Sequence, residues 1–407
     1  MNLTNCDKTT VYDFDSLVDR FDHGSIKWEN AKHIFTSDGN LDNLKFSGRP
    51  LAVSTADMDF KIAPEIVAAI CETAAKFVYG YTVPTAKYFD AVISWLERRH
   101  KVMIERSWIS LSPGVVAAIH YAISEFTNPD DGVIVQMPVY RPFHASVRSL
   151  RRRIVNNMLV RDGKSYKIDF DDFERKAAEP ATKMFILCNP HNPVGRVWTI
   201  DELEKIASIC TKHGVIVISD EIHADIVFSP YKHASYCLLP QELWKNAIIC
   251  TSPSKSFNMC GLQISNIIIR DTVMRQNFVR RSYMFGFHAP NCFAAAAAIA
   301  AYNRAEDWLD QMLRYVYGNY EMVKEFIETK IPQIEVMQLQ GTYLQWLNFE
   351  ALGITGHERE NLLRHKAGIF FESGYIFGEG GDAFERLNLA YPKSFLNELL
   401  QRLLSIN

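Results

Sequence analysis

The chain has 407 residues, of which 48% are hydrophobic and 22% are charged. A chain of this length can bury a large apolar core without disulfides or metal ions, and it can form two or three domains at roughly 100–200 residues each. Because 44 Lys and Arg nearly balance 47 Asp and Glu, the net charge gives no bulk attraction for nucleic acid or an anionic membrane. No apolar run is long enough to span a bilayer, so we expect a soluble protein that acts on a small molecule.

The N-terminus and the cysteines indicate the compartment. Residues 1–10 lack the basic start, apolar core and small-residue cleavage site of a secretory signal, which predicts a cytoplasmic protein. The 8 cysteines form no C-x-x-C pair and no zinc-ligand spacing, and several, such as Cys188, lie within apolar runs. This pattern favours buried, reduced thiols over a disulfide scaffold or a metal site.

In chain order, residues 1–50 are polar and irregular, whereas short apolar runs and helix-like stretches alternate from residue 51 to about 290. Five runs rich in Val and Ile predict buried strands: Val133–Gln136, Met184–Cys188, Val215–Ser219, Ala247–Thr251 and Ile264–Arg270. Gly114–Phe126 and Asp201–His213 predict helices between them. Strands separated by helices predict an α/β fold with a mostly parallel sheet, whose ligands bind beyond the carboxyl ends of the strands.

The pattern changes near Pro290. Long helical stretches at Cys292–Tyr302 and Trp308–Thr329 precede two strand-like runs near Gly341–Asn348 and Gly374–Phe377. We therefore expect a large domain over residues 51–290 and a smaller α+β domain over residues 291–407. Residues 1–50 are expected to form an arm that packs with the small domain.

Two predicted strands end in residues that carry chemistry. Met184–Cys188 is followed by Asn189-Pro190-His191-Asn192-Pro193-Val194-Gly195, where two prolines and a glycine predict a tight turn. A single Asn-Pro is ordinary turn chemistry, but the doubled motif favours a rigid placement of Asn192. Val215–Ser219 runs into Asp220, which either caps the next turn or meets a cationic nitrogen.

The next strand end carries a lysine. Ala247–Thr251 continues into Ser252-Pro253-Ser254-Lys255-Ser256-Phe257-Asn258. Lys255 is either a solvated loop charge or a Schiff-base lysine that binds a carbonyl cofactor. Three successive strand ends thus supply Asn192, then Asp220, then Lys255.

This ordered series resembles the fold-type-I pyridoxal-phosphate enzymes, the aspartate aminotransferase superfamily, and within it the cystathionine β-lyase and cystalysin branch of C–S lyases. The likeness covers nearly the whole chain and includes Ala56–Phe60, Gly80–Thr82, Pro138–Tyr140 and Arg386–Ala390. It implies pyridoxal 5'-phosphate as cofactor, a large cofactor domain beside a smaller α+β domain, and a homodimer with shared active sites.

The resemblance also implies roles for the strand-end residues. Lys255 would bind the cofactor aldehyde and later take the α-proton of the substrate, which calls for a lowered pKa. Asp220 would pair with the ring nitrogen and keep it protonated, and Asn192 would donate to the phenolate oxygen of the ring beside the substrate. His223 would face the cofactor where many aminotransferases have a tyrosine.

The cofactor phosphate needs N–H donors and a positive dipole. Ser112-Pro113-Gly114 follows the strand-like run Trp108–Leu111 and opens the helix Gly114–Phe126, which is either an ordinary helix start or an anion site. The resemblance favours four phosphate contacts: the amides of Val115 and Val116 and the hydroxyls of Ser252 and Ser254. Gln263 stands where many relatives have a phosphate-binding arginine.

Three more residues match family positions. Tyr140 would stack over the ring and handle protons near the leaving group. Tyr81 would reach the phosphate held by the neighbouring subunit, and Arg386 would bind the substrate carboxylate through its planar fork. Close lyase relatives have a second tyrosine where this chain has Arg141, and the effect of this difference stays open.

The resemblance predicts β-elimination at an L-amino acid with sulfur on Cβ. L-cystathionine, L-cysteine or related S-substituted cysteines would give a thiol or hydrogen sulfide, pyruvate and ammonia. An aminotransferase is the alternative, because the same lysine, aspartate and arginine serve amino transfer. A regulator that binds a transcription activator is an alternative of another class, since some members of the branch resemble one. The sequence points to no nucleic acid, membrane or metal partner.

Overall fold

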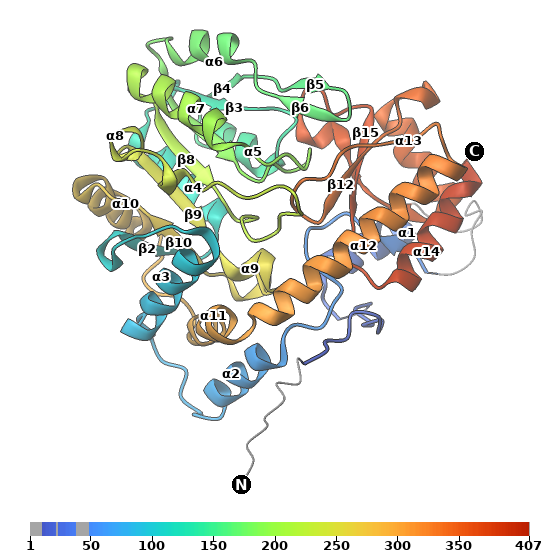
Figure 1. The fold of residues 1–407 in the computed structure, drawn as a ribbon, viewed down its shortest axis with the longest axis horizontal. Coiled ribbons are helices and arrows are strands. Elements are labelled where there is room, and N and C mark those ends of the chain that lie inside the picture. Colours follow the sequence, from blue (N-terminus) through green and yellow to red (C-terminus); the bar gives the residue numbers. More distant parts are fainter. Residues whose placement is uncertain (1–9, 22, 38–48, 407) are drawn as a thin grey trace.

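The computed structural model describes residues 10–21, 23–37 and 49–406, and its elements gather around two sheets (Figure 1). The larger sheet has seven strands in this order: β2 (Ile109–Ser112), β10 (Ser265–Ile268), β9 (Ala247–Thr251), β8 (Ile216–Asp220), β7 (Thr182–Cys188), β3 (Gly132–Val135) and β4 (Arg153–Asn156). β10 runs antiparallel to both of its neighbours, and the other adjacent strands are parallel. The mostly parallel sheet is thus confirmed, and each of the five predicted strands overlaps an observed one.

Helices cover both faces of this sheet because successive residues of a strand point to opposite faces. Met184 and Ile186 of β7 belong to a core with α4 (Val115–Phe126), α5 (Arg141–Ser149) and α10 (Thr272–Met284). Phe185 and Leu187 belong to the opposite core, with α6 (Phe170–Ala177) and α7 (Ile200–His213). A strand buried on both faces explains the unbroken apolar run of the sequence.

Local signals set the limits of the predicted helices. Thr199 and Glu202 form a capping box at the start of α7, and Gly214 ends the helix in the left-handed conformation. α4 begins one residue after Gly114, whose φ of 135° is a value that residues with a Cβ rarely adopt. Both predicted helices therefore agree with the structure to within one residue.

The C-terminal part is built on a four-stranded antiparallel sheet. Its strands are β11 (Glu335–Val336), β12 (Leu344–Asn348), β15 (Phe384–Asn388) and β14 (Glu372–Ser373). Its helices are α12 (Glu306–Lys330), α13 (Gly356–Leu362), a π-helical turn (Leu363–Ala367) and α14 (Lys393–Leu403). Short elements that precede the C-terminal part in the chain include the hairpin β5 (Val160–Asp162) and β6 (Ser165–Lys167), α8 (Gln241–Trp244) and α9 (Pro253–Ser256).

The prediction of a strand at Gly374–Phe377 is wrong, because these residues form a 3-10 helix. Gly374 packs so tightly against the backbone carbonyls of Gly381 and Phe384 that a Cβ would collide with both. The glycines therefore fold residues 374–381 into a compact turn between β14 and β15. The apolar residue Phe377 belongs to the core, where its ring packs against Trp346 with the ring centroids 5.4 Å apart.

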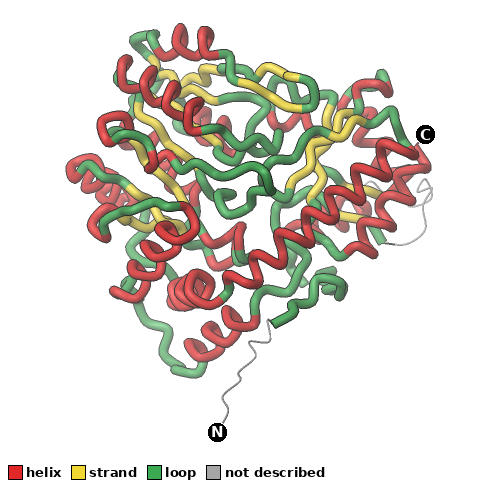
Figure 2. Tube along the Cα trace, in the orientation of Figure 1, coloured by secondary structure: helices red, strands yellow, loops and turns green. Residues whose placement is uncertain are grey.

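The chain crosses between the two sheets several times. β1 (Leu51–Ala52) pairs with β13 (Ile369–Phe370) of the C-terminal part. α11 (Cys292–Arg304) packs instead against α2 (Pro64–Ala74) and α3 (Ala86–His100), and the loops that follow the large-sheet strands gather between the two sheets (Figure 2). The division of the chain at residues 50 and 290 stays a prediction.

The described part of residues 1–50 contains α1 (Ile26–Ser37), where the sequence indicated irregular structure. Phe14 packs against Trp308 of α12 with ring centroids 5.6 Å apart, and Lys27 of α1 donates a hydrogen bond to the Tyr391 hydroxyl. These residues thus contact the C-terminal part, and the rest of the predicted arm lies outside the described residues. No described helix is both long and apolar enough to cross a membrane. The cysteines of the described part are free thiols, with Cys188, Cys210 and Cys250 buried.

Candidate active site

A cavity of about 370 Å³ lies where α4 and α9 approach the ends of β7, β8 and β9. Eight of the eleven predicted site residues line it: Val115, Val116, Tyr140, Asn192, Asp220, His223, Ser254 and Lys255. β9, β8 and β7 are neighbours in the sheet, so their carboxyl ends bring together residues that are far apart in the sequence. The other three, Ser252, Arg386 and Tyr81, lie outside this lining.

Asp220 is the last residue of β8 and is 4% exposed. Burial raises the pKa of its carboxyl group to about 7, although the Ile222 amide, which donates to Oδ1 at 3.0 Å, and Lys255 lower it. A cationic partner stabilises the ionised form of such a carboxylate, which burial alone disfavours. The site is therefore suited to a protonated ring nitrogen.

Lys255 lies on α9, the short helix that Ser252 caps. Its Nζ donates to the Ala56 carbonyl at 2.5 Å, and the Tyr343 hydroxyl donates to the same oxygen at 2.9 Å. Burial lowers the pKa of Lys255, but Cys260, Tyr343 and Tyr140 raise it, and the net direction is upward. The lowered pKa expected from the sequence is thus wrong for this structure, because the thiol and the two phenols around Nζ favour its charged form.

Asn192 connects the cavity to Arg386. The turn holding Asn192 closes through the His191 amide, which donates to the Arg196 carbonyl at 2.7 Å. The Arg386 guanidinium donates from Nη1 to Asn192 Oδ1 at 3.0 Å and from Nη2 to the Ser54 carbonyl at 2.6 Å. Arg386 Nε is buried and has no partner among the described residues. Arg386 thus lies directly behind Asn192 with an N–H group unused.

The start of α4 offers an anion site. The first amide groups of a helix have no partner within the helix, and they combine with the positive end of its dipole. Val115 and Val116 open this helix and face the cavity together with Ser254. The Ser252 hydroxyl instead accepts from the Ser254 amide at 3.1 Å and donates to the Ile264 carbonyl at 2.7 Å. Ser252 therefore shapes this end of the cavity rather than lining it.

Tyr140 and His223 add two side chains to the wall of the cavity. Burial raises the pKa of the Tyr140 phenol, so the hydroxyl keeps its proton at neutral pH. Burial, followed by Lys255 and Arg386, lowers the pKa of His223 well below its usual value. His223 Nδ1 is buried without a partner among the described residues, which leaves a neutral imidazole with one nitrogen available.

Tyr81 is fully exposed and is not among the cavity residues. Phe77, Val78 and Val83 of the same loop are also exposed, at 85%, 78% and 74%. One chain alone therefore does not bring Tyr81 to the cavity, and its contact with a neighbouring subunit stays a prediction. Arg141 is exposed at the start of α5.

Sequence reasoning missed two residues of the site. Tyr343 shares the Ala56 carbonyl with Lys255, and Cys260 lines the cavity near Nζ. Tyr343 precedes β12 in a stretch without a recognisable motif, so only the tertiary structure reveals it. Cys260 lies five residues after Lys255, and this proximity was the signal that could have indicated it.

The cavity fits the predicted cofactor. Asp220 suits a cationic ring nitrogen, the free amides of α4 suit a phosphate, and Lys255 offers a primary amine between them. His223, whose buried Nδ1 has no partner among the described residues, lines the same cavity. These groups are complementary to pyridoxal phosphate in both charge and hydrogen bonding.

Comparison with known proteins identifies the family. The family described as aminotransferase class I and II matches residues 51–403, and the chain belongs to it. Cystathionine beta-lyase PatB of Bacillus subtilis (strain 168) is 37% identical over 390 residues, which are 96% of this chain and 98% of PatB.

Two solved structures show the same fold. Cystalysin from Treponema denticola, which contains a pyridoxal 5'-phosphate cofactor, has a TM-score of 0.93 and 36% identity over 98% of this chain and 99% of its own. A pyridoxal-phosphate-bound C–S lyase from Staphylococcus hominis, in complex with the inhibitor L-cycloserine, has a TM-score of 0.89 and 29% identity over 98% of each chain. The predicted family resemblance and the fold-type-I architecture are confirmed.

Proposed function

We propose that this chain is a pyridoxal-phosphate-dependent lyase that eliminates a thiol from L-amino acids with sulfur on Cβ, such as L-cystathionine, L-cysteine or related S-substituted cysteines. The main support for this proposal is that Lys255, Asp220 and Asn192 line one cavity. Asn192 also accepts a hydrogen bond from Arg386. The likeness to a cystathionine beta-lyase and to a C–S lyase over nearly the whole chain supports the choice of reaction.

The cofactor would be held by residues that line the cavity. The carboxylate of Asp220 would pair with the ring nitrogen, and Asn192 would donate its amide to the ring oxygen. The amides of Val115 and Val116 with the Ser254 hydroxyl would bind the phosphate, and Tyr140 and His223 would contact the ring. When bound, pyridoxal phosphate supplies an electron sink that stabilises negative charge on the α-carbon of the substrate.

The remaining residues bind the amino acid and move protons. Arg386 fixes the substrate carboxylate with its guanidinium fork, and its unused Nε provides one of the two parallel donors that such a fork needs. Once an amino acid displaces it from the cofactor, Lys255 is a neutral amine that can take the α-proton. The Tyr140 hydroxyl, which stays protonated, gives a proton to the leaving sulfur. Elimination releases a thiol or hydrogen sulfide, and hydrolysis of the remaining fragment gives pyruvate and ammonia.

One assay tests this reaction. Purified protein with pyridoxal phosphate is incubated with L-cystathionine or L-cysteine in the absence of any keto acid, and pyruvate is followed with lactate dehydrogenase. We expect pyruvate from the wild type and none from Lys255→Ala. The protein is also expected to be yellow, and borohydride should attach the cofactor to Lys255, as peptide mapping would show.

An aminotransferase is the second candidate, because the family that matches the chain includes class I and II aminotransferases. Amino transfer uses the same lysine, aspartate and arginine but needs a keto acid acceptor. If added keto acids accept amino groups while cystathionine and cysteine yield no pyruvate, the lyase proposal is wrong.

We also propose a homodimer, in which Tyr81 of each chain completes the phosphate site of the other. Tyr81 lies on an exposed apolar loop that includes Phe77 and Val78. A loop of this composition is characteristic of an interface. Its phenol would compensate for Gln263, which lines the cavity and stands where many relatives have a phosphate-binding arginine.

A further inference from the structure

Residues 54–60, which follow β1, pass beside the active-site cavity, and we call them the 54–60 segment. The Ala56 carbonyl of this segment accepts the hydrogen bond of Lys255 Nζ at 2.5 Å. The Ser54 carbonyl accepts from Arg386 Nη2 at 2.6 Å. The position of the segment therefore sets the polar partners of both the lysine and the substrate arginine.

Lys27, in the first turn of α1, reaches this segment from the N-terminal part of the chain. Its side chain is buried, with 1% of the residue exposed. Nζ donates to the Asp57 carbonyl at 2.9 Å, to the Asp59 carboxylate and to the Tyr391 hydroxyl at 2.8 Å. It also lies 2.9 Å from Asp57 Oδ1. An ammonium group has three N–H donors, so Lys27 directs all of them to the 54–60 segment and to Tyr391.

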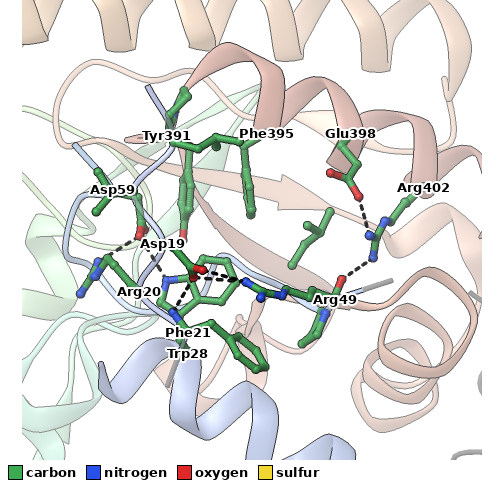
Figure 3. A pocket seen from close by; sticks show the side chains of 15 residues that line it. Asp19, Arg20, Phe21, Trp28, Arg49, Asp59, Tyr391, Phe395, Glu398 and Arg402 are labelled. Carbon is green, nitrogen blue, oxygen red and sulfur yellow. Dashed lines mark hydrogen bonds and ion pairs between the residues drawn. The ribbon is translucent and has the colours of Figure 1, made fainter. Parts of the chain in front are cut away.

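Two further N-terminal residues contact the same carboxylates. Arg20 pairs with Asp57 at 2.6 Å and with Asp59 at 3.1 Å, and Trp28 Nε1 donates to Asp59 at 3.1 Å. Figure 3 shows Arg20 and Trp28 directed toward Asp59, beside a second cavity of about 470 Å³. Ala56 lines the active-site cavity and Asp59 lines this second one, so the segment separates the two.

The charge of Asp57 influences the protonation of Lys255. Burial raises the pKa of Asp57, but Lys27 and Arg20 lower it, and the net direction is downward. Asp57 is therefore ionised at neutral pH, and its charge is one of those that favour the protonated form of Lys255. A change at Lys27 would alter both the place of the Ala56 carbonyl and the charge near Nζ.

We propose that Lys27 is a positioning residue for Lys255: through Asp57 and Asp59 it holds the 54–60 segment where the Ala56 carbonyl receives the Lys255 amine. The inference rests on the proposed function, because the contact serves the proton transfers assigned to Lys255. Lys27 touches neither the cavity nor the assigned substrate site. Within the segment it contacts Asp57 and Asp59, next to Ala56, and not Ser54, which receives Arg386. Its effect is therefore expected in the turnover rate rather than in substrate binding.

Lys27→Met tests the proposal because methionine keeps the length of the side chain without the donors. We expect kcat to fall about tenfold, since small displacements of reacting groups reduce rates by such factors. KM should change by about twofold or less, because Arg386 keeps its bond to Asn192. The matched control is Lys176→Met, which removes an ammonium that contacts Asp172 and the Asn156 carbonyl, neither of which belongs to the segment, and it should keep the wild-type kcat. A wild-type kcat in Lys27→Met overturns the proposal.

A double variant separates positioning from stability. Lys27→Met leaves Arg20 as the one cation that pairs with both Asp57 and Asp59, so one negative charge is uncompensated. Lys27→Met with Asp59→Asn restores the charge balance, so its unfolding midpoint should recover. Its kcat should stay low, because the Asp57 carbonyl still lacks its donor. In the cofactor-free protein, hydrogen exchange at the amides of Met58 and Asp59 should be faster than in the wild type for both variants. Recovery of kcat together with the unfolding midpoint, or unchanged exchange, overturns the proposal.

The same variants keep this inference distinct from the proposed lyase activity. If the wild type yields no pyruvate, the lyase proposal fails while Lys255 still binds pyridoxal phosphate. The growth of the visible band after pyridoxal phosphate is added to cofactor-free protein then provides the measurement. We expect this rate to be about tenfold lower in Lys27→Met than in the wild type and in Lys176→Met. Equal rates overturn the positioning role.

Discussion

At the scale of single residues, Asp220 couples cofactor binding to the release of a proton. Burial raises the pKa of its carboxyl group to about 7, and a cationic ring nitrogen would lower it again. Binding therefore releases a proton from Asp220 when the pH lies below 7, so affinity for pyridoxal phosphate should rise with pH. The expected slope is up to about tenfold per pH unit between about pH 5 and 7, measured by titrating the visible band.

Asp220→Asn isolates this contribution because asparagine does not ionise in this range. The variant should bind the cofactor more weakly and should lose the additional slope that the wild type shows only below pH 7. Lys255, whose pKa is raised, stays charged on both sides of pH 7, so any slope that it causes is the same in both ranges and in both proteins. The same slope below pH 7 in the wild type and in Asp220→Asn would contradict the assignment.

Glu372 is the second residue with a testable effect. It lies opposite Arg386 across the β14–β15 pair, and its Oε2 is 3.3 Å from Nη2. The Ser54 and Asn192 oxygens already orient the guanidinium at shorter distances. Glu372 thus competes with a substrate carboxylate for the positive charge of Arg386.

Glu372→Gln is therefore expected to lower KM about fivefold at unchanged kcat, which corresponds to roughly 1 kcal/mol for a pair of a buried Arg386 and a partly exposed Glu372. Steady-state kinetics of pyruvate release measure both constants. Glu379→Gln, at an exposed position of the following turn, is the control and should leave KM unchanged. A raised KM in Glu372→Gln would show instead that the carboxylate orients Arg386.

At the scale of elements, Asp225 ties α9 to the rest of the large sheet. It follows β8 and accepts from Ser256 Oγ at 2.5 Å, from Trp95 Nε1 at 3.1 Å and from His100 Nε2 at 2.7 Å. Burial raises its pKa, but His100 lowers it and the net direction is downward. The carboxylate thus joins the lysine helix to α3.

Asp225→Ala should reduce the free energy of unfolding by about 3 kcal/mol, because it leaves buried donors without an acceptor. Since the pKa of Asp225 is lowered on folding, its contribution is present at neutral pH and is lost as the pH falls into the acid range. Denaturant unfolding at neutral and acid pH measures both effects. Asp90→Ala, at an exposed position of α3, should change stability little. A similar loss in both variants would contradict the role of Asp225.

The sequence was sufficient to predict strands and helices that are marked by their own residues, such as an unbroken apolar run. The apolar runs of β7, β8 and β9 and the chemistry at their carboxyl ends predicted Asn192, Asp220 and Lys255 in one place, because parallel strands end at one edge. The 3-10 helix at Gly374–Phe377 was not predicted, because its turn depends on contacts with Gly381. Tyr343 and Lys27 were missed for the same reason, since their partners lie far away in the sequence.

At the scale of the whole molecule, the active site depends on segments that the sequence assigned to separate parts. The 54–60 segment follows a strand that pairs with β13, and it touches both Lys255 and Arg386. The N-terminal Lys27 and the C-terminal Tyr391 contact each other beside it. A site built from both parts of one chain can also include a residue of a second chain, and the exposed Tyr81 fits that position.

Mixing two inactive variants tests the shared site. Lys255→Ala lacks the lysine but keeps Tyr81, whereas Tyr81→Ala lacks the phenol but keeps Lys255. In a two-fold dimer that exchanges subunits, each mixed dimer contains one site with both residues intact, so an equal mixture should regain roughly a quarter of wild-type activity. Pyruvate release after denaturation and joint refolding measures this recovery, and light scattering gives the mass. A dimer that regains no activity would place Tyr81 outside the shared site, and a monomer with full activity would overturn the dimer itself.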